Sequence, residues 1–357
     1  SINSEAPIVI MTTEVLRNMI YSASNTLTDL RYVVMDEVHY LADRFRGAVW
    51  EEILIHLPES IAIAALSATV SNAEEFGEWL QTVRGEMQVI VSEVRPIPLY
   101  QHVLFGNRLL DLFSSNTKVN PEILRLEKES FRAIKGKYGS NSGKRDWRSN
   151  SQLTASVRAL GRAEVIERLD REGLLPAITF IFSRAQCDSA VRQCVTSGLR
   201  LTTSDERIEI RAVIAEKTSN LPEDDLAILG FYEWADALER GIAAHHAGLL
   251  PAFKECVEEL FQKGLVKAVF ATETLALGIN MPAKTVVLEK LTKWNGESHV
   301  AITPGEYTQL TGRAGRRGID IEGNAVILWN KDIDSASAAG LASTRTYPLK
   351  SSFKPTY

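Results

Sequence analysis

The sequence of 357 residues predicts an α/β protein with two domains, each built on a parallel sheet. Short apolar runs of strand type alternate with amphipathic, helix-like segments along most of the chain, as expected for βαβ units. The chain is long enough to bury two sizeable cores. Polar residues that could bind a ligand or transfer a proton follow several of the apolar runs. In parallel sheets, ligands bind at the carboxyl ends of the strands.

Composition narrows the class of protein and of partner. The hydrophobic fraction of 45% and the charged fraction of 24% are ordinary for a soluble globular protein. The net charge of −5 means that any binding of a polyanion must depend on local groups. No apolar run is long enough to span a membrane, so no membrane partner is predicted. Cys187, Cys194 and Cys256 lack zinc-ligand spacing, which predicts buried thiols in a reducing, cytoplasmic compartment.

The first domain is expected to occupy residues 1–104. Its predicted strands are Ile8–Met11, Tyr32–Met35, Ile61–Leu66 and Gln88–Val91, and its predicted helices include Thr13–Tyr21 and Ala73–Gln81. Ser71 is a plausible N-cap of the second helix, because Glu74 and Glu75 fall in the first turn, where the helix dipole favours acids.

The pattern loosens over residues 105–172, which predicts a linker or insertion. Within it, Lys135–Arg148 reads KGKYGSNSGKRDWR, with many basic residues, three glycines and no apolar period. This composition predicts a flexible basic loop. Two interpretations stay open: a solvated surface excursion, or a contact to a polyanion.

A second α/β domain is expected over residues 173–342. Its predicted strands are Ala177–Phe182, Ile242–Ala244, Val266–Ala271, Thr285–Leu288 and Ala325–Trp329, with a helix over Leu250–Lys263. The remaining residues, 343–357, read STRTYPLKSSFKPTY and suggest the start of a further, truncated domain.

Two adjacent acids end the first strongly predicted strand, in the stretch YVVMDEVHYL. If the ligand is Mg–ATP, Asp36 would bind the metal through water, since Mg²⁺ dehydrates reluctantly, and Glu37 would orient and deprotonate the attacking water. Taken alone, the pair fits equally well with acids placed at a helix start. A neighbouring predicted strand, IAIAALSAT, ends in Ser67 and Thr69, whose hydroxyls could bind the acids and His39. No G-x-S-x-G elbow surrounds Ser67, so we expect a polar latch and not a nucleophile.

Two later stretches also suit phosphates. In ATETLALGINMPAKTV, Thr272 and Thr274 offer small hydroxyls for backbone phosphates, Gly278 permits close approach and Asn280 offers an amide. An ordinary helix cap is the alternative.

The stretch QLTGRAGRRG combines three glycines with three arginines, although each glycine costs a helix about 1 kcal/mol. Guanidinium groups bind phosphate oxygens bidentately, and an arginine can stabilise a transferring phosphoryl group. A basic surface turn is the alternative. His245 and His246 are neighbours on a predicted strand and point to opposite faces, so they cannot chelate one metal together. We therefore expect no structural metal.

Seven stretches in chain order resemble the ordered motifs of superfamily 2 helicases: TTEVLRNM, DEVH, SAT, FIFSRAQCD, AAHHAGLLP, ATETLALGINMPA and QLTGRAGRRG. The stretch DRFRGAVWEE after the DEVH box resembles the Ski-like (superkiller) branch, the exosome-associated RNA helicases. The basic insertion and the tail are most similar to actinobacterial members.

This resemblance implies two RecA-like domains, with ATP and Mg²⁺ bound between them and a single RNA strand, with a 3′ overhang, across both. It implies an ATP-dependent RNA helicase in cytoplasmic RNA processing, with a ribonuclease complex as a possible partner. Asp36 and Glu37 would hold Mg²⁺ and water, and His39 would couple them to Ser67 and Thr69. The implied contacts to nucleotide phosphates are Gln309, Arg313 and Arg316, with Arg316 as arginine finger, and Gly278 and Asn280 nearby. The implied contacts to the nucleic-acid backbone are Thr13, Arg17, Ser183, Arg184, Thr272 and Thr274.

One family motif is missing, namely the phosphate cradle G-x-x-x-x-G-K-[ST]. The nearest match, GSNSGK at Gly139–Lys144, has its glycines too close together and no preceding strand. We therefore expect a fragment that begins midway through the first RecA-like domain and is inactive alone. Three rival interpretations remain: a DNA helicase of the repair branch, a non-enzymatic RNA-binding scaffold, and a metal-dependent hydrolase built on Asp36 and Glu37.

Overall fold

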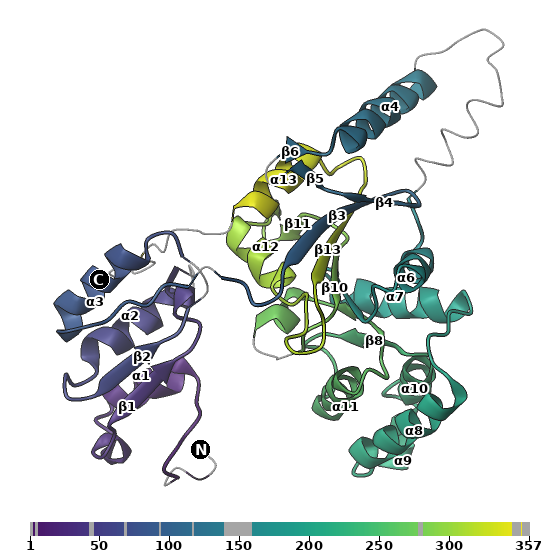
Figure 1. The fold of residues 1–357 in the computed structure, drawn as a ribbon. Helices are drawn as coiled ribbons and strands as arrows, with labels where there is room; N and C mark the ends of the chain where they lie inside the picture. The colour runs from purple at the N-terminus through teal and green to yellow at the C-terminus, as the bar shows by residue number, and fades with distance from the viewer. Residues whose placement is uncertain are drawn as a thin grey trace, which may run out of the picture. The chain divides into compact units, whose positions relative to one another are not determined.

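The computed structural model describes residues 3, 6–42, 46–67, 70–92, 94–115, 118–138, 159–277, 281–344 and 351. These residues form two compact units (Figure 1). Unit 1 contains the described residues up to Val94 together with Thr344 and Ser351, and unit 2 runs from Arg95 to Ser343. Each unit is an α/β structure, as the sequence predicts.

Unit 1 contains a pair of parallel strands with three α-helices. Its elements are α1 (Thr13–Tyr21), η1 (Asn25–Leu27), β1 (Tyr32–Met35), η2 (Val38–Ala42), α2 (Gly47–His56), β2 (Ala62–Ala65) and α3 (Ala73–Arg84). β1 pairs with β2 from Tyr32 opposite Ala62 to Met35 opposite Ala65. The two strand tips therefore lie side by side, where the candidate acids follow β1.

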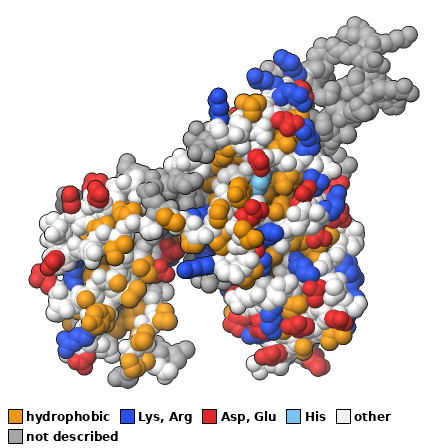
Figure 2. Space-filling view, viewed as in Figure 1, with side chains coloured by type: hydrophobic (Ala, Val, Ile, Leu, Met, Phe, Trp, Pro, Cys, Tyr) orange, Lys and Arg blue, Asp and Glu red, His pale blue; other side chains and the backbone are white. Residues whose placement is uncertain are grey.

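The core of unit 1 lies on one face of this sheet. Val33 and Met35 are buried and pack with Ile53 of α2, whereas Tyr32 and Val34 are 77% and 67% exposed. This alternation follows from the two-residue period of a strand. Figure 2 shows hydrophobic side chains gathered on the surface of this unit.

Two predicted strands of unit 1 are wrong. Residues 8–11 and 88–91 form no strand in the described structure. An apolar run becomes a strand only where a neighbouring strand satisfies its backbone groups, and the described partner of β1 is β2. α3 begins after Asn72 and not after Ser71, with Glu74 and Glu75 in its first turn as predicted.

Unit 2 is built on a seven-stranded sheet in the order β4-β3-β13-β10-β7-β9-β8. Its strands are β3 (Leu99–Phe105), β4 (Arg108–Asp111), β7 (Ala177–Phe180), β8 (Ile242–His245), β9 (Ala268–Ala271), β10 (Thr285–Leu288) and β13 (Gly323–Leu328). β3 and β4 are antiparallel, and the other neighbours pair in parallel. All five strands predicted for this domain are confirmed, with ends that differ by a few residues.

Helices cover both faces of the large sheet (Figure 1). One face packs against α6 (Arg162–Arg171) and α7 (Arg184–Thr196). The other packs against α8 (Ser204–Thr218), α10 (Phe231–Glu239), α11 (Pro251–Gln262), α12 (Pro304–Thr311) and α13 (Ser335–Ser343). The remaining elements are β5 (Phe113–Ser115), β6 (Lys118–Val119), α4 (Pro121–Tyr138), α9 (Glu223–Leu226), η3 (Glu273–Leu277), β11 (Thr292–Trp294) and β12 (His299–Ala301).

The three cysteines are buried in these two cores, as predicted. Cys187 and Cys194 lie on the buried face of α7, and Cys256 lies on the buried face of α11. Burial raises the pKa of each thiol to about 12, so all three stay protonated and unreactive near neutral pH.

Two expected boundaries fall inside elements of unit 2. Residue 104 lies in β3, which pairs with β13 within the large sheet of unit 2. Residues 135–138 of the predicted basic loop form the end of α4, and residues 139–148 lie outside the described part. Among the described residues, no helix is both long and apolar enough to cross a membrane.

Candidate nucleotide and nucleic-acid sites

The two acids follow directly after the tip of β1. Glu37 adopts a left-handed backbone conformation with φ 55°, which is strained for a residue with a side chain. Its N–H donates to Oδ1 of Asp36 at 3.0 Å. The next N–H, of Val38, donates to the carbonyl of Leu66 at 2.8 Å and so ties this turn to the tip of β2. The turn therefore holds both carboxylates at a fixed place on the strand edge.

His39 packs behind these acids. It is 5% exposed, and its Nδ1 lies 3.2 Å from Oε2 of Glu37, whose side chain is half exposed. Burial lowers the pKa of His39, although the charge of Asp36 opposes this shift. The imidazole is therefore neutral near pH 7, and its Nδ1–H can donate to the Glu37 carboxylate. This arrangement orients a solvent-accessible carboxylate that could accept a proton.

The residues expected to surround this acid pair are only partly described. Ser67 is exposed and follows the tip of β2, next to the turn that carries the acids. Thr69, Gly278 and Asn280 lie outside the described residues. Their predicted roles stay predictions.

The QLTGRAGRRG stretch forms the last turn of α12 and a loop, residues 312–318, that we call the arginine turn. Gln309 is partly buried near the helix end. The guanidinium of Arg313 donates to the carbonyl of Ala276, which lies within the predicted phosphate-binding stretch that begins at Ala271. The backbone of the turn is fixed to Ala283, whose N–H donates to Arg313 at 2.9 Å and whose carbonyl accepts from Gly315 at 2.7 Å.

Arg316 is held by a bidentate ion pair. Its Nε and Nη2 donate to the two carboxylate oxygens of Asp320, each at 2.8 Å, and its backbone N–H donates to Oδ2 at 2.9 Å. Burial by itself would raise the pKa of Asp320, but the hydrogen bonds and charge of Arg316 outweigh it and keep the pKa below its usual value. A guanidinium has more N–H donors than this pair uses, so Arg316 can also bind an anion.

Two glycines, one in the arginine turn and one at the start of β13, have packing roles that the sequence does not reveal. Gly315 has φ 89°, and an added Cβ there would lie 2.8 Å from Cγ2 of Ile97. At Gly323, which starts β13, an added Cβ would lie 2.7 Å from the backbone of Ala314. Close approach of backbone explains these two glycines, independently of any ligand.

Four of the predicted nucleic-acid contacts lie at neighbouring strand tips of unit 2. Ser183 is the N-cap of α7 without a side-chain capping bond, and Arg184 is exposed. Thr272 follows β9, the strand next to β7, and its Oγ1 lies 2.9 Å from Oγ1 of Thr274. The fold therefore brings hydroxyls and one exposed arginine together at one edge of the sheet.

The two adjacent histidines bind different helices. Nε2 of His245 lies 2.8 Å from Glu258 of α11, and Nε2 of His246 lies 2.9 Å from Asp188 of α7. Their side chains thus diverge, as the strand period predicts. In unit 1, Thr13 and Arg17 lie on α1, and the guanidinium of Arg17 is 3.6 Å from Glu52.

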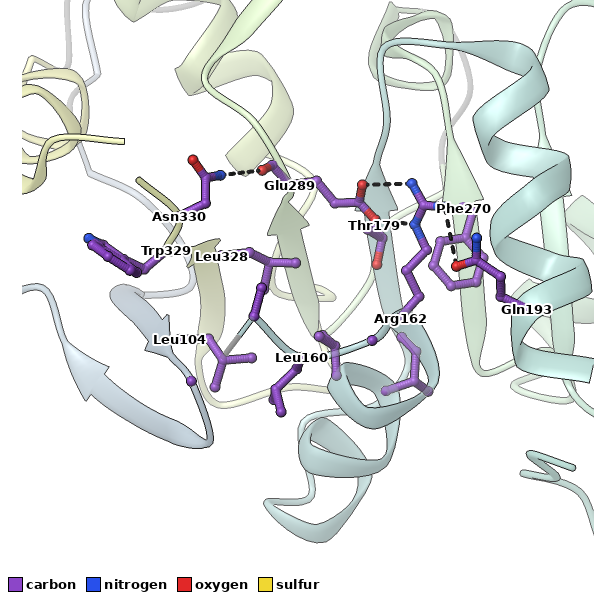
Figure 3. Close-up of a pocket in the computed structure, with 15 residues that line it drawn as sticks. Leu104, Leu160, Arg162, Thr179, Gln193, Phe270, Glu289, Leu328, Trp329 and Asn330 are labelled. Carbon is purple, nitrogen blue, oxygen red and sulfur yellow. Dashed lines mark hydrogen bonds and ion pairs between the residues drawn. The ribbon is translucent and has the colours of Figure 1, made fainter. Parts of the chain in front are cut away.

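Two cavities in unit 2 are distinct in character. The larger, about 250 Å³, lies beside the start of α6 and has a largely apolar wall crossed by the Arg162–Glu289 ion pair (Figure 3). No candidate site residue lines it. The smaller, about 90 Å³, is lined by Ser183, Lys290 and the exposed Trp294, among others. Sequence analysis did not identify Trp294, although an aromatic beside lysines is a usable signal for nucleic acid.

Two family models match the chain. The DEAD/DEAH box helicase model matches residues 1–76, and the helicase conserved C-terminal domain model matches residues 202–318. A probable helicase HelY of Mycobacterium tuberculosis is 59% identical over 370 residues, which is 100% of this chain and 40% of the relative. Human Superkiller complex protein 2 is 38% identical over 369 residues, covering 100% of this chain and 29% of the relative. The DExH-box ATP-dependent RNA helicase DExH10 of Arabidopsis thaliana is 37% identical, covering 100% and 36%.

The α/β fold and the two matched domains, both RecA-like, are those of a superfamily 2 helicase. The chain belongs to the Ski-like branch of these helicases and shares a higher identity with mycobacterial relatives than with the human one. It spans 40% or less of the length of each of these relatives.

Proposed function

We propose that the full-length protein is an ATP-dependent RNA helicase and that Glu37 is the base that activates water for ATP hydrolysis. The observation that carries this proposal is the Glu37 carboxylate, half exposed at a strand tip, fixed by a left-handed turn and oriented by a buried, neutral His39. Such a carboxylate can accept the proton of an attacking water.

The donor set of the same turn fits the expected cofactor. Asp36 and Glu37 are carboxylates, the ligand type that Mg²⁺ prefers, and both are exposed. When bound, Mg–ATP supplies the phosphoryl group and neutralises part of its charge. Asp36 would hold the metal through water, and Glu37 would orient the water that attacks. We assign Arg313 and Arg316 to the phosphates, because their guanidinium groups are held in fixed positions by Ala276 and Asp320.

We assign RNA to the strand-tip surface of Ser183, Arg184, Thr272 and Thr274. Small hydroxyls and an arginine bind phosphates without reading sequence, which suits a helicase that must pass along any strand. The printed names of the human and Arabidopsis relatives, a superkiller complex protein and an RNA helicase, support RNA over DNA as the substrate.

Unwinding of matched duplexes tests this assignment. We expect the full-length protein, with ATP and Mg²⁺, to unwind an RNA duplex with a 3′ single-stranded overhang faster than the DNA duplex of the same sequence. The Glu37→Gln variant serves as the control for contaminating activity. Equal or faster unwinding of DNA would assign the protein to a DNA-directed role, and unwinding without ATP would contradict the proposal.

A further inference from the structure

A short segment at the start of unit 2 packs along the arginine turn, although no sequence motif marks it. Nη2 of Arg95 lies 2.6 Å from the carbonyl oxygen of Ala314 and 3.5 Å from that of Thr311. Two residues later, Ile97 contacts Gly315, and the carbonyl of Pro98 accepts from the N–H of Gly323 at 2.8 Å. Residues 95–98 therefore pack against the middle of the turn and against the elements on either side of it, the end of α12 and the start of β13.

The chemistry of these contacts suits a cation. Thr311 is the last residue of α12, and the carbonyls at a helix C-terminus lack intrahelical donors and carry partial negative charge. Nη2 of a guanidinium carries two N–H groups, so this one nitrogen can donate to both carbonyls. Arg95 thus binds the end of α12 and the turn that follows it with one side chain.

The position of the second carbonyl makes this contact relevant to the turn. Ala314 lies between Arg313 and Arg316, so the orientation of its peptide group helps to set where these two side chains project. Other contacts hold the same turn: Ala283 binds the backbone beside Arg313, and Asp320 binds Arg316. Arg95 adds a contact from a distant part of the chain, because it precedes Ala314 by 219 residues.

The origin of Arg95 adds a second consequence. It is the first residue of unit 2, directly after Val94, where the N-terminal part of unit 1 ends. The connecting segment, by which we mean the chain around Val94 and Arg95, is therefore hydrogen-bonded to the arginine turn through Arg95. A displacement of that segment would act directly on the carbonyls of Thr311 and Ala314.

We propose that Arg95 is a positioning residue for the arginine turn. It holds the carbonyls of Thr311 and Ala314 so that Arg313 and Arg316 present their guanidinium groups to phosphate, and it couples the shape of the turn to the connecting segment. The presentation of these guanidinium groups to phosphate rests on the proposed phosphate-binding function of the turn.

Hydrogen exchange tests the clamp itself, without any ligand. In the full-length Arg95→Ala variant, amides of residues 312–318 should exchange several-fold faster than in wild type, the amide of Gly315 among them. The matched control is Arg84→Ala in unit 1, since Arg84 donates to the carbonyls of Pro58 and Ile61 at 2.9 and 2.8 Å. It also loses a carbonyl-binding arginine, but exchange in the arginine turn should be unchanged.

Turnover then tests positioning. Because Arg95 acts through the turn, Arg95→Ala should lower kcat for RNA-stimulated ATP hydrolysis by about tenfold and leave the KM for ATP and the RNA affinity within about twofold. Arg95→Lys keeps the positive charge but not the planar guanidinium group, so its kcat should lie between those of Arg95→Ala and wild type. In a background that lacks both turn arginines, Arg313→Ala with Arg316→Ala, Arg95→Ala should lower kcat by no more than a further factor of about two.

Several outcomes would overturn the proposal. Unchanged exchange in residues 312–318 would exclude the clamp. A full additional loss from Arg95→Ala in the variant that lacks both Arg313 and Arg316 would exclude action through the turn. Normal turnover by Arg316→Ala would instead refute the phosphate-binding function, while the exchange result would still decide the clamp. If Arg95→Ala does not fold, Arg95→Gln takes its place. Exchange of residues 312–318 that is no faster in Arg95→Gln than in Arg95→Lys would then contradict the proposal.

Discussion

Asp320 determines how the guanidinium of Arg316 is presented. The pair is bidentate, and the side chain of Asp320 is 5% exposed compared with 22% for Arg316. A buried carboxylate that holds one face of a guanidinium fixes its plane, and this pre-organisation matters for an arginine that must meet a developing charge. An arginine at a surface turn without such a partner would have to be ordered by the substrate.

Neutralising Asp320 therefore tests whether the position of Arg316 matters as well as its charge. Asp320→Asn should lower kcat for RNA-stimulated ATP turnover by about tenfold, less than Arg316→Ala does, while RNA affinity changes little in either variant. The matched control is Glu209→Gln, since Glu209 forms a long ion pair of 3.9 Å with Lys263 at the surface. Equal loss of turnover and RNA binding in Arg316→Ala would make Arg316 a nucleic-acid contact.

The sequence analysis predicted none of these residue contacts, although one of them is local. The Arg316–Asp320 pair spans four residues and was within reach of a local pattern search. The contacts of Arg95 with Ala314 and of Ile97 with Gly315 join segments more than 200 residues apart, and no local signal encodes them. The same holds for the left-handed conformation of Glu37, which depends on the bond from Val38 to Leu66.

At the scale of elements, strands buried on both faces were the most predictable. β7, β9 and β10 are continuous apolar runs with every residue buried, and the sequence predicts all three. Residues 8–11 and 88–91 have similar apolar runs but no strand partner in the described structure, so the prediction failed there. β3 belongs to the large sheet of unit 2 because it pairs with β13, which lies more than 200 residues later in the chain. The sequence analysis placed most of β3 in the first domain, because nothing local indicates this pairing.

The adjacent tips of β7 and β9 give a prediction about nucleic acid. Arg184→Ala should weaken RNA binding at every sequence and lower the slope of log affinity against log salt by about one, because one phosphate contact is lost. Thr272→Val should weaken binding with little change in that slope, since a hydroxyl releases no counterion. Measurement of RNA affinity at several salt concentrations checks both.

Arg192 provides the control for this prediction. It is an exposed arginine on the same helix as Arg184, beyond the strand tips. Arg192→Ala should leave both RNA affinity and salt slope near wild type. A slope change as large as that of Arg184→Ala would show that general positive charge, and not the strand-tip surface, binds RNA.

At the scale of the whole molecule, the order of motifs was more informative than any single motif. Asp-Glu after a strand, Thr-Glu-Thr after another and an arginine-glycine turn each have an ordinary structural explanation, and Gly315 indeed has one. The first of these lies in the region that matches the DEAD/DEAH box helicase model, and the other two lie in the region that matches the helicase C-terminal domain model. The proposed function depends most on the role of Glu37 as the base in ATP hydrolysis.

The most direct test of that role compares ATP turnover with ATP binding in Glu37→Gln. The change removes the charge that activates water and keeps the size and shape of the side chain. In the full-length protein with RNA and Mg²⁺, turnover should fall by at least about 100-fold while ATP affinity stays within about threefold. Glu59→Gln, at an exposed position of unit 1, should match wild type. Near-normal turnover in Glu37→Gln, or a parallel loss of ATP binding, would contradict the account.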